Sequence, residues 1–153
     1  MKASMRKIAL LFALLPLAAF ATPPDACTIL SLDDVNSVAG GLATKVQAVH
    51  SGNPSECIFA DAKRAAVLTI RIREVQYAAA DELHQEREND QKVYRTQSKD
   101  VPGVGEHGYW MQHNGRLGFH KGKTLVFVSF QTPKYQNEVA TAQIARMIES
   151  RLK

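Results

Sequence analysis

Three of the five histidines lie in Val101–Phe130, a segment that also contains the only tryptophan of the chain. Imidazole nitrogens serve as metal ligands and as acid–base groups, so His107, His113 and His120 are the first candidates for chemistry. If the segment forms antiparallel strands joined at Asn114-Gly115, His107 lies about 20 Å from His113 along its strand. His107 and His120 then come nearer to each other, on one face of the sheet.

A metal site built on His107 and His120 needs a third donor, because protein zinc sites use three or four protein ligands. Glu106 is one candidate, and any other would come from a part of the chain that the sequence does not place. Ordinary exposed or half-buried histidines are the simpler interpretation. We therefore keep a periplasmic metal-binding protein as an alternative and expect no cofactor.

Other chemical motifs are weak. Gly103–Gly108 matches the GxGxxG pattern. A dinucleotide-binding loop of this pattern follows a strand and begins a helix, whereas Gly103–Gly108 is expected to be followed by a strand. The serines fall in caps and turns, except Ser129, and no GxSxG or paired-carboxylate pattern occurs. We therefore predict that the protein is not an enzyme.

Residues 1–21 have the features of a signal peptide. Three basic residues precede the apolar run Ile8–Phe20, and Ala19-Phe20-Ala21 gives the small-x-small cleavage pattern. The run is shorter than the about 20 residues that a membrane span needs. We expect cleavage before Thr22, one domain over residues 22–153, and location in the periplasm, with the extracellular space as the alternative.

Removal of the signal peptide changes the charge balance. The full chain has 19 Lys and Arg against 15 Asp and Glu, and three basic residues leave with the signal, so 16 remain against 15. A net charge of +1 gives no support for nucleic-acid binding. No second long apolar run follows, so we expect no transmembrane segment after cleavage.

Both cysteines, Cys27 and Cys57, lie in the exported part. In an oxidising compartment two cysteines without another partner most simply form one disulfide. Neither has a neighbouring cysteine or histidine at ligand spacing, which argues against metal binding by this pair.

Periodicity and turn residues predict an α+β domain with a mainly antiparallel sheet and helices packed on it. The expected element order is αβββ-αβββ-α. In chain order the elements are a helix over Leu32–Ala39, strands over Lys45–His50, Cys57–Ala60 and Ala66–Glu74, a helix over Tyr77–Gln91, three strands within Val101–Phe130, and a helix from Thr132-Pro133 to Leu152. Tyr94–Asp100 is a linker or a weak strand, and Glu82–Asp90 is interpreted as a solvated helix face.

Asn114-Gly115 favours a two-residue type I′ hairpin turn, which would oppose Trp110 to Phe119. A second two-residue loop at Lys121-Gly122 would oppose Val126 to Leu117. Side-chain alternation then directs Trp110, Leu117 and Phe119 to the core. A three-residue second loop would instead invert the last strand, because a one-residue slip exchanges its faces.

The last strand is apolar on both faces, so another part of the chain, a second copy or a partner must cover the second face. That face would carry Tyr109, Met111, His120, Leu125 and Phe127. We predict this surface as the binding site of an exported, non-catalytic module for an unknown protein or small ligand of the cell envelope, with a homodimer as one possibility. A further alternative is an inhibitor or immunity protein that blocks a secreted enzyme with the loop Ser51–Glu56.

Three features together resemble a known group of exported domains: the helix entry Asp25–Val35, a second cysteine at Cys57, and the glycine-rich turn Val101–Trp110. The chain resembles the DUF3558 lipoproteins and the extracellular sensor domains of some receptor kinases. The resemblance implies an α+β fold, a Cys27–Cys57 bridge and a role in binding rather than catalysis. Such lipoproteins often carry a lipobox, which this chain lacks, so the resemblance does not extend to a lipid anchor.

Overall fold

The computed structural model describes residues 22–153, so the predicted signal peptide lies outside the described residues. The elements are α1 (Leu32–Ala39), β1 (Lys45–His50), β2 (Ser55–Ala60), β3 (Ala66–Glu74), α2 (Ala79–Tyr94), β4 (Ser98–Asp100), β5 (Glu106–Met111), β6 (Arg116–Lys121), β7 (Thr124–Phe130) and α3 (Glu138–Arg151). This order confirms the predicted αβββ-αβββ-α fold, to which β4 adds one short strand.

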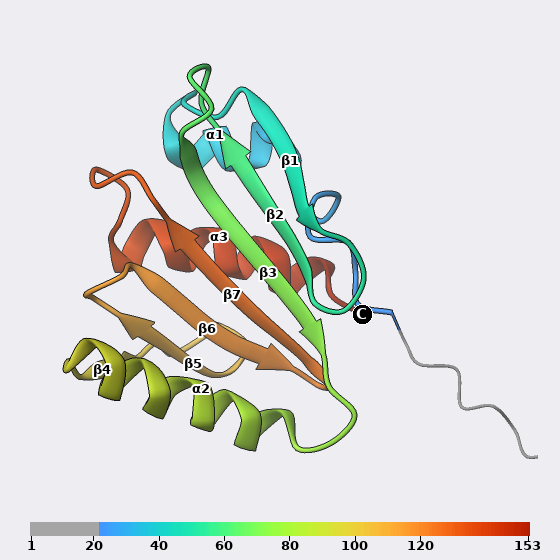
Figure 1. Ribbon diagram of the computed structural model, residues 1–153, viewed down its shortest axis with the longest axis vertical. Helices are drawn as coiled ribbons and strands as arrows, with labels where there is room; N and C mark the ends of the chain where they lie inside the picture. The colour runs from blue at the N-terminus through green and yellow to red at the C-terminus, as the bar shows by residue number, and fades with distance from the viewer. Residues whose placement is uncertain (1–21) are drawn as a thin grey trace, which may run out of the picture.

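The strands form a single antiparallel sheet in the order β1-β2-β3-β7-β6-β5-β4. α1 and α3 pack on one face, and α2 crosses the other face over β5, β6 and β7 (Figure 1). Within residues 22–153 no helix is long and apolar enough to cross a bilayer.

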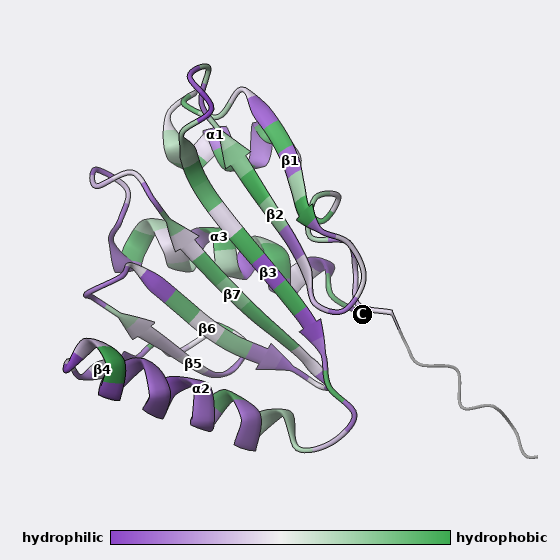
Figure 2. Ribbon diagram, in the orientation of Figure 1, coloured by the Kyte–Doolittle hydropathy of each residue, from purple (hydrophilic) through white to green (hydrophobic). Residues whose placement is uncertain are grey.

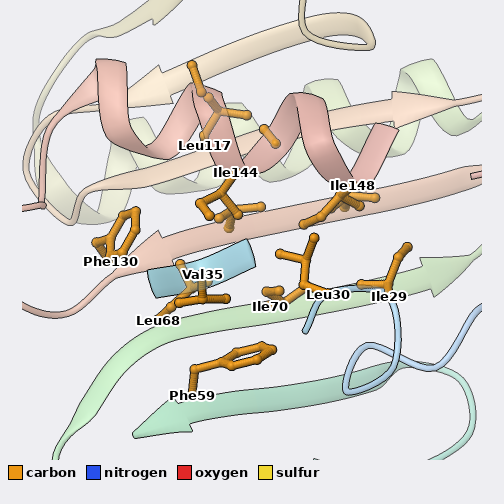
Figure 3. Close-up of a cluster of buried hydrophobic side chains, with 14 of the residues drawn as sticks. Ile29, Leu30, Val35, Phe59, Leu68, Ile70, Leu117, Phe130, Ile144 and Ile148 are labelled. Atoms are coloured by element: carbon orange, nitrogen blue, oxygen red, sulfur yellow. The ribbon is translucent and has the colours of Figure 1, made fainter. Parts of the chain in front are cut away.

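The main core lies between the sheet and the pair α1 and α3. Figure 3 shows Phe59, Leu68 and Ile70 of the sheet facing Val35 of α1 and Ile144 of α3. The predicted core residues of the last three strands, Trp110, Leu117 and Phe119, belong to this cluster. Alternation along the strands therefore predicted the buried face correctly.

A capping box formed by Ser31 and Asp34 begins α1. The Ser31 hydroxyl accepts a hydrogen bond from the Asp34 backbone N–H, and the Asp34 carboxylate accepts one from the Ser31 backbone N–H at 2.7 Å. Gly40 ends the helix with φ 61°, a left-handed conformation that glycine adopts without strain. Arg151, at the end of α3, donates two hydrogen bonds to Asp34, at 2.7 and 2.8 Å, which ties the two helices together.

The predicted disulfide is present between Cys27 and Cys57, which are 30 residues apart. It joins the turn before α1 to β2, the second strand of the sheet. The Ala26 backbone N–H donates to the Ser55 hydroxyl at 2.9 Å beside it, so a hydrogen bond supports the same junction.

The two hairpins differ from their predicted registers. Trp110 opposes Leu117 rather than Phe119, and Phe119 opposes Val126. Type I′ turns need positive φ at both central residues, whereas Gly115 has φ 60° and Asn114 is not left-handed, so residues 112–115 form a longer turn. Both pairings shift by two residues, which keeps every side chain on its predicted face.

The second loop lies at Gly122-Lys123, one residue later than predicted, and remains a two-residue connection between Lys121 and Thr124. α3 also starts later than predicted. Asn137 is its N-cap, and its side chain accepts a hydrogen bond from the Ala140 backbone N–H, while Thr132-Pro133 begins a separate turn. A proline at a first helical position is a preference and does not specify a helix by itself.

Candidate functional site

The predicted binding surface lies inside the protein. Its five residues are between 0% and 5% exposed: Tyr109, Met111, His120, Leu125 and Phe127. α2 covers them, and four of the five form a second apolar cluster with residues of the α2 entry, Val75, Ala79 and Leu83. The prediction of an exposed site here is wrong, because the chain's own helix buries the second apolar face. A homodimer through these residues would require α2 to leave the sheet.

Acidic side chains hold α2 on the sheet, although Glu82–Asp90 looked like a solvated face. Glu82, Glu86 and Asp90 recur at every fourth position, so they share one side of the helix. Arg116 of β6 contacts Asp90 at 2.9 Å and Glu86 at 3.3 Å, and Arg73 of β3 contacts Glu82 at 2.8 Å. Figure 2 shows α2 as a mainly hydrophilic helix, which explains why its apolar stripe alone did not predict its position.

Burial also changes the pKa of two groups at the contact between α2 and the sheet, Asp90 of α2 and Tyr109 of β5. Desolvation raises the pKa of Asp90 above its ordinary value, against the opposing effect of Arg116. Desolvation likewise raises the pKa of Tyr109, whose hydroxyl donates to the Asp90 carboxylate at 3.3 Å. The Tyr109 ring therefore remains a neutral wall of the space next to it.

A cavity of about 200 Å³ lies between the first turns of α2 and the strand β5. Its walls combine apolar and nitrogen-bearing side chains: Ala80, Leu83, His84, Arg87, His107 and Tyr109. A second cavity of about 350 Å³ shares Arg87 and His107 and extends along the loop Val101–Gly105. We call the first of these the α2–β5 pocket.

His107 enters this pocket through a local distortion of β5. Its φ is 55°, a left-handed value that side chains with a Cβ rarely adopt. The pairing of β5 with β6 shifts between Glu106 and Tyr109, so His107 lies in a β-bulge. Bulges redirect side chains and occur often beside binding sites. Gly108 allows the bulge to pack closely, since a Cβ there would lie 2.5 Å from the Val104 carbonyl oxygen.

The rings of His107 and His120 are stacked, with centroids 5.5 Å apart and planes inclined by 28°. His120 is 5% exposed, its Nδ1 lies 3.3 Å from the Gly122 carbonyl oxygen, and Glu106 lies 3.8 Å from the same nitrogen. Its Nε2 is buried and has no hydrogen-bond partner within residues 22–153. A buried polar atom without a partner is uncommon, and within residues 22–153 the Nε atoms of Arg71 and Arg73 share this feature with His120.

The structure brings together two of the three histidines that the sequence singled out. His113 lies apart, against the Tyr94 ring at 5.0 Å. His107 and His120 approach each other as expected, but they meet through ring faces rather than through nitrogen lone pairs. In the described part of the chain no three histidine, cysteine or acidic side chains are grouped so that they could hold a metal ion.

The loop Ser51–Glu56, proposed as an inhibitory loop, is partly exposed and firmly attached. Ser51, Gly52 and Asn53 are exposed, whereas Ser55 is buried. The Asn53 side chain donates to the Glu74 carbonyl oxygen at 2.8 Å and accepts from the Glu74 N–H at 3.0 Å. This contact attaches the loop to the end of β3, a strand that contributes no residue to the α2–β5 pocket.

Sequence reasoning identified His107 but missed Ala80, His84 and Arg87, the helical side of the pocket. Their spacing of three and four residues marks one helix face and was a usable signal. Comparison of the sequence with known families and with curated proteins finds no matching family and no curated relative. The resemblance to the DUF3558 lipoproteins remains a prediction.

Proposed function

We propose that the protein is an exported, non-catalytic binding module that holds a small organic acid in the α2–β5 pocket. The observation that carries the proposal is the left-handed His107 in its β-bulge, stacked on the buried His120. Backbone conformations of this kind persist where the surrounding structure maintains them, and they concentrate at ligand sites.

The pocket walls support an acid with a flat apolar part. Ala80 and the ring of His107 offer exposed apolar surface, with Leu83 and Tyr109 buried behind them, while Arg87 supplies a guanidinium group. Arg87 is held in place by Asp100 at 2.6 Å and lies 5.5 Å from the centre of the Tyr109 ring. Arg87 Nε donates to Ser98 and Nη1 donates to Asp100, so Nη2 is the group that can donate to a ligand carboxylate. The volume of about 200 Å³ limits the ligand to a small molecule.

Export is the second part of the proposal, with the periplasm as the destination. It is supported by the Cys27–Cys57 disulfide, since such bonds form and persist in oxidising compartments. The signal-peptide pattern of residues 1–21 points the same way. Recovery of a mature chain that begins at Thr22 from the periplasmic fraction tests it, and retention of residues 1–21 in the cytoplasm contradicts it.

Three matched probes test the binding site: benzoate, benzyl alcohol and benzylamine. We expect benzoate to bind most tightly and benzylamine most weakly, because Arg87 Nη2 can donate a hydrogen bond to a carboxylate and cannot donate one to an ammonium group. Calorimetric titration gives the affinities, and nuclear magnetic resonance shift changes at His107 and Ala80 locate the probe. His107→Ala should weaken benzoate binding. His113→Ala, which removes a histidine outside the pocket, is the matched control and should leave the affinity unchanged. Equal affinity for all three probes, or shift changes confined to other surfaces, contradicts the proposal.

A further inference from the structure

A second cavity continues from the α2–β5 pocket, since Arg87 and His107 line both. It has a volume of about 350 Å³, and its remaining walls are Asp100, Val101, Pro102, Gly103, Gly105 and Gly108. Sites for small molecules usually have volumes of about 300–1,000 Å³, so the α2–β5 pocket, at about 200 Å³, holds only part of such a ligand. The rest of the ligand would lie beside Arg87 and Asp100, where the two cavities meet.

Strand pairing places Asp100 and Ser98 on the side of the sheet that α2 covers. Asp100 of β4 opposes Tyr109 of β5, and Ser98 opposes Met111. Tyr109 and Met111 belong to the apolar cluster beneath α2. Directly opposed residues of paired strands point to the same face, so the Asp100 carboxylate and the Ser98 hydroxyl both contact Arg87 of α2.

The Arg87 guanidinium is fixed by three contacts. Its Nε donates to the Ser98 hydroxyl, its Nη1 donates to Asp100 Oδ1 at 2.6 Å, and its central carbon lies 5.5 Å from the centre of the Tyr109 ring. Among residues 22–153, neither Arg87 Nη2 nor Asp100 Oδ2 has a hydrogen-bond partner. The pair therefore presents a free donor beside a free acceptor, and the hydrogen bond between the two side chains orients both groups before a ligand arrives.

The Arg87–Asp100 pair carries no net charge, which limits the ligands that suit it. A ligand with a carboxylate alone can bond to Arg87 but also meets the negative charge of Asp100, and a ligand with an ammonium group alone meets the opposite conflict. The side chain of Arg87 is 26% exposed and that of Asp100 is 76% exposed. Water and salt therefore screen the Asp100 charge more strongly, so the carboxylate contact is the stronger of the two. A molecule that carries both groups satisfies the donor and the acceptor together.

We propose that the ligand is an α-amino acid with a flat apolar side chain. Its carboxylate accepts a hydrogen bond from Arg87 Nη2, and its ammonium group donates one to Asp100 Oδ2. The two groups of an α-amino acid are attached to the same carbon, which matches the adjacent donor and acceptor of the pair. The side chain of the ligand lies in the α2–β5 pocket against Ala80 and the His107 ring. The inference rests on the proposed function, because it uses the same pocket and the same carboxylate contact.

Three compounds with the same phenylethyl skeleton test the inference on the full mature chain: L-phenylalanine, 3-phenylpropionate, which lacks the ammonium group, and 2-phenylethylamine, which lacks the carboxylate. We expect calorimetric titration to show that L-phenylalanine binds about five- to tenfold more tightly than 3-phenylpropionate, the effect of one added hydrogen bond. The amine should bind most weakly. Equal affinity for L-phenylalanine and 3-phenylpropionate overturns the amino-acid inference and leaves the small-acid function supported, whereas failure of all three compounds and of benzoate to bind overturns both.

The variant Asp100→Asn shows whether Asp100 binds the ammonium group or only holds Arg87 in place. Asparagine keeps one acceptor oxygen for Arg87 Nη1 and replaces the other oxygen with an amide group that only donates. We expect L-phenylalanine to lose its advantage in affinity over 3-phenylpropionate. Asp33→Asn, at an exposed acid of α1 outside both cavities, makes the same change in charge and should keep this advantage. The inference is overturned if the advantage persists in Asp100→Asn, because Asp100 would then act only through Arg87, or if Asp33→Asn removes it as well.

Discussion

At the scale of single residues, His107 is the most unusual position in the described chain. Four residues other than glycine have positive φ: Arg64, Ala78, Arg95 and His107. Ala78 and Arg95 are the caps of α2, and Arg64 lies in the turn between β2 and β3, where left-handed conformations are common. His107 alone lies within a strand, and neither its φ nor its bulge could be predicted from residue types.

Replacement of His107 by glycine should separate stability from binding. Glycine adopts φ 55° without the penalty of about 1 kcal/mol that a Cβ brings, so we expect urea unfolding to show a slightly more stable protein. Benzoate binding should be lost at the same time. Arg95→Gly, at the C-cap of α2, is the control and should gain stability without loss of binding. A destabilised His107→Gly protein would show that the histidine side chain supports the fold.

Asp34 should make the free energy of unfolding depend on pH in the acidic range. The hydrogen bonds from Arg151, followed by those from Ser31, lower the pKa of Asp34 well below its ordinary value. A lowered carboxyl pKa in the folded state stabilises the protein above the unfolded value of about 3.9, and this contribution is lost as the pH falls towards the folded pKa. Asp34→Asn should therefore reduce stability at neutral pH by about 1 kcal/mol, and the difference from the unmodified protein should shrink below about pH 4. Denaturant unfolding at several pH values measures it, with the exposed Asp33→Asn as the control that should not change this dependence.

At the scale of elements, the sequence predicted which face of a strand is buried more reliably than it predicted which residues pair across strands or where α2 packs. Alternation depends only on strand geometry, so Trp110, Leu117 and Phe119 were correctly assigned to the core. Register depends on turn conformation, and the turn at Asn114-Gly115 proved longer than the type I′ hairpin that its residues favour. The position of α2 depends on long-range ion pairs between Glu86, Asp90 and Arg116, which periodicity within one helix does not reveal.

Phe127 tests the burial of the sheet face beneath α2. Its ring is 5% exposed and lies 4.0 Å from the Arg116 guanidinium carbon. Phe127→Glu should remove apolar packing and bury a carboxylate, at a loss of about 4 kcal/mol or more. Tyr77→Glu, at an aromatic residue that is 78% exposed, is the matched control and should unfold normally. A Phe127→Glu protein of unchanged stability would mean that α2 does not cover this face in solution.

At the scale of the whole molecule, one sheet with helices on both faces leaves cavities on both sides of its β5 edge. The α2 side has imidazole and guanidinium groups around His107, and the α3 side has a cavity of about 490 Å³ lined by residues that include Gln97, Trp110 and Gln112. His107 and Trp110 lie on the same strand, so a single stretch of sequence contributes to the walls of cavities on both faces. The sequence marked this stretch as central, whereas the helical walls of both cavities required the tertiary structure.

At the same scale, the disulfide stabilises the domain because it ties the segment before α1 to β2, the second strand of the sheet. The bridge closes a loop of 30 residues, which stabilises the native state by about 3–4 kcal/mol through the restricted unfolded chain. The double variant Cys27→Ala and Cys57→Ala should lose this amount in urea unfolding. Its denaturant dependence, the m value, should also become steeper, because an unfolded chain without the bridge exposes more surface.

Reduction of the unmodified protein is the matched control, since it removes the same bridge while keeping both sulfur atoms. The reduced protein and the double variant should agree in free energy of unfolding and in m value. If only the double variant were destabilised, the loss would come from packing at Cys57, which is fully buried, rather than from the cross-link. If neither changed, the bridge would contribute nothing to stability and would serve only to position the N-terminal segment.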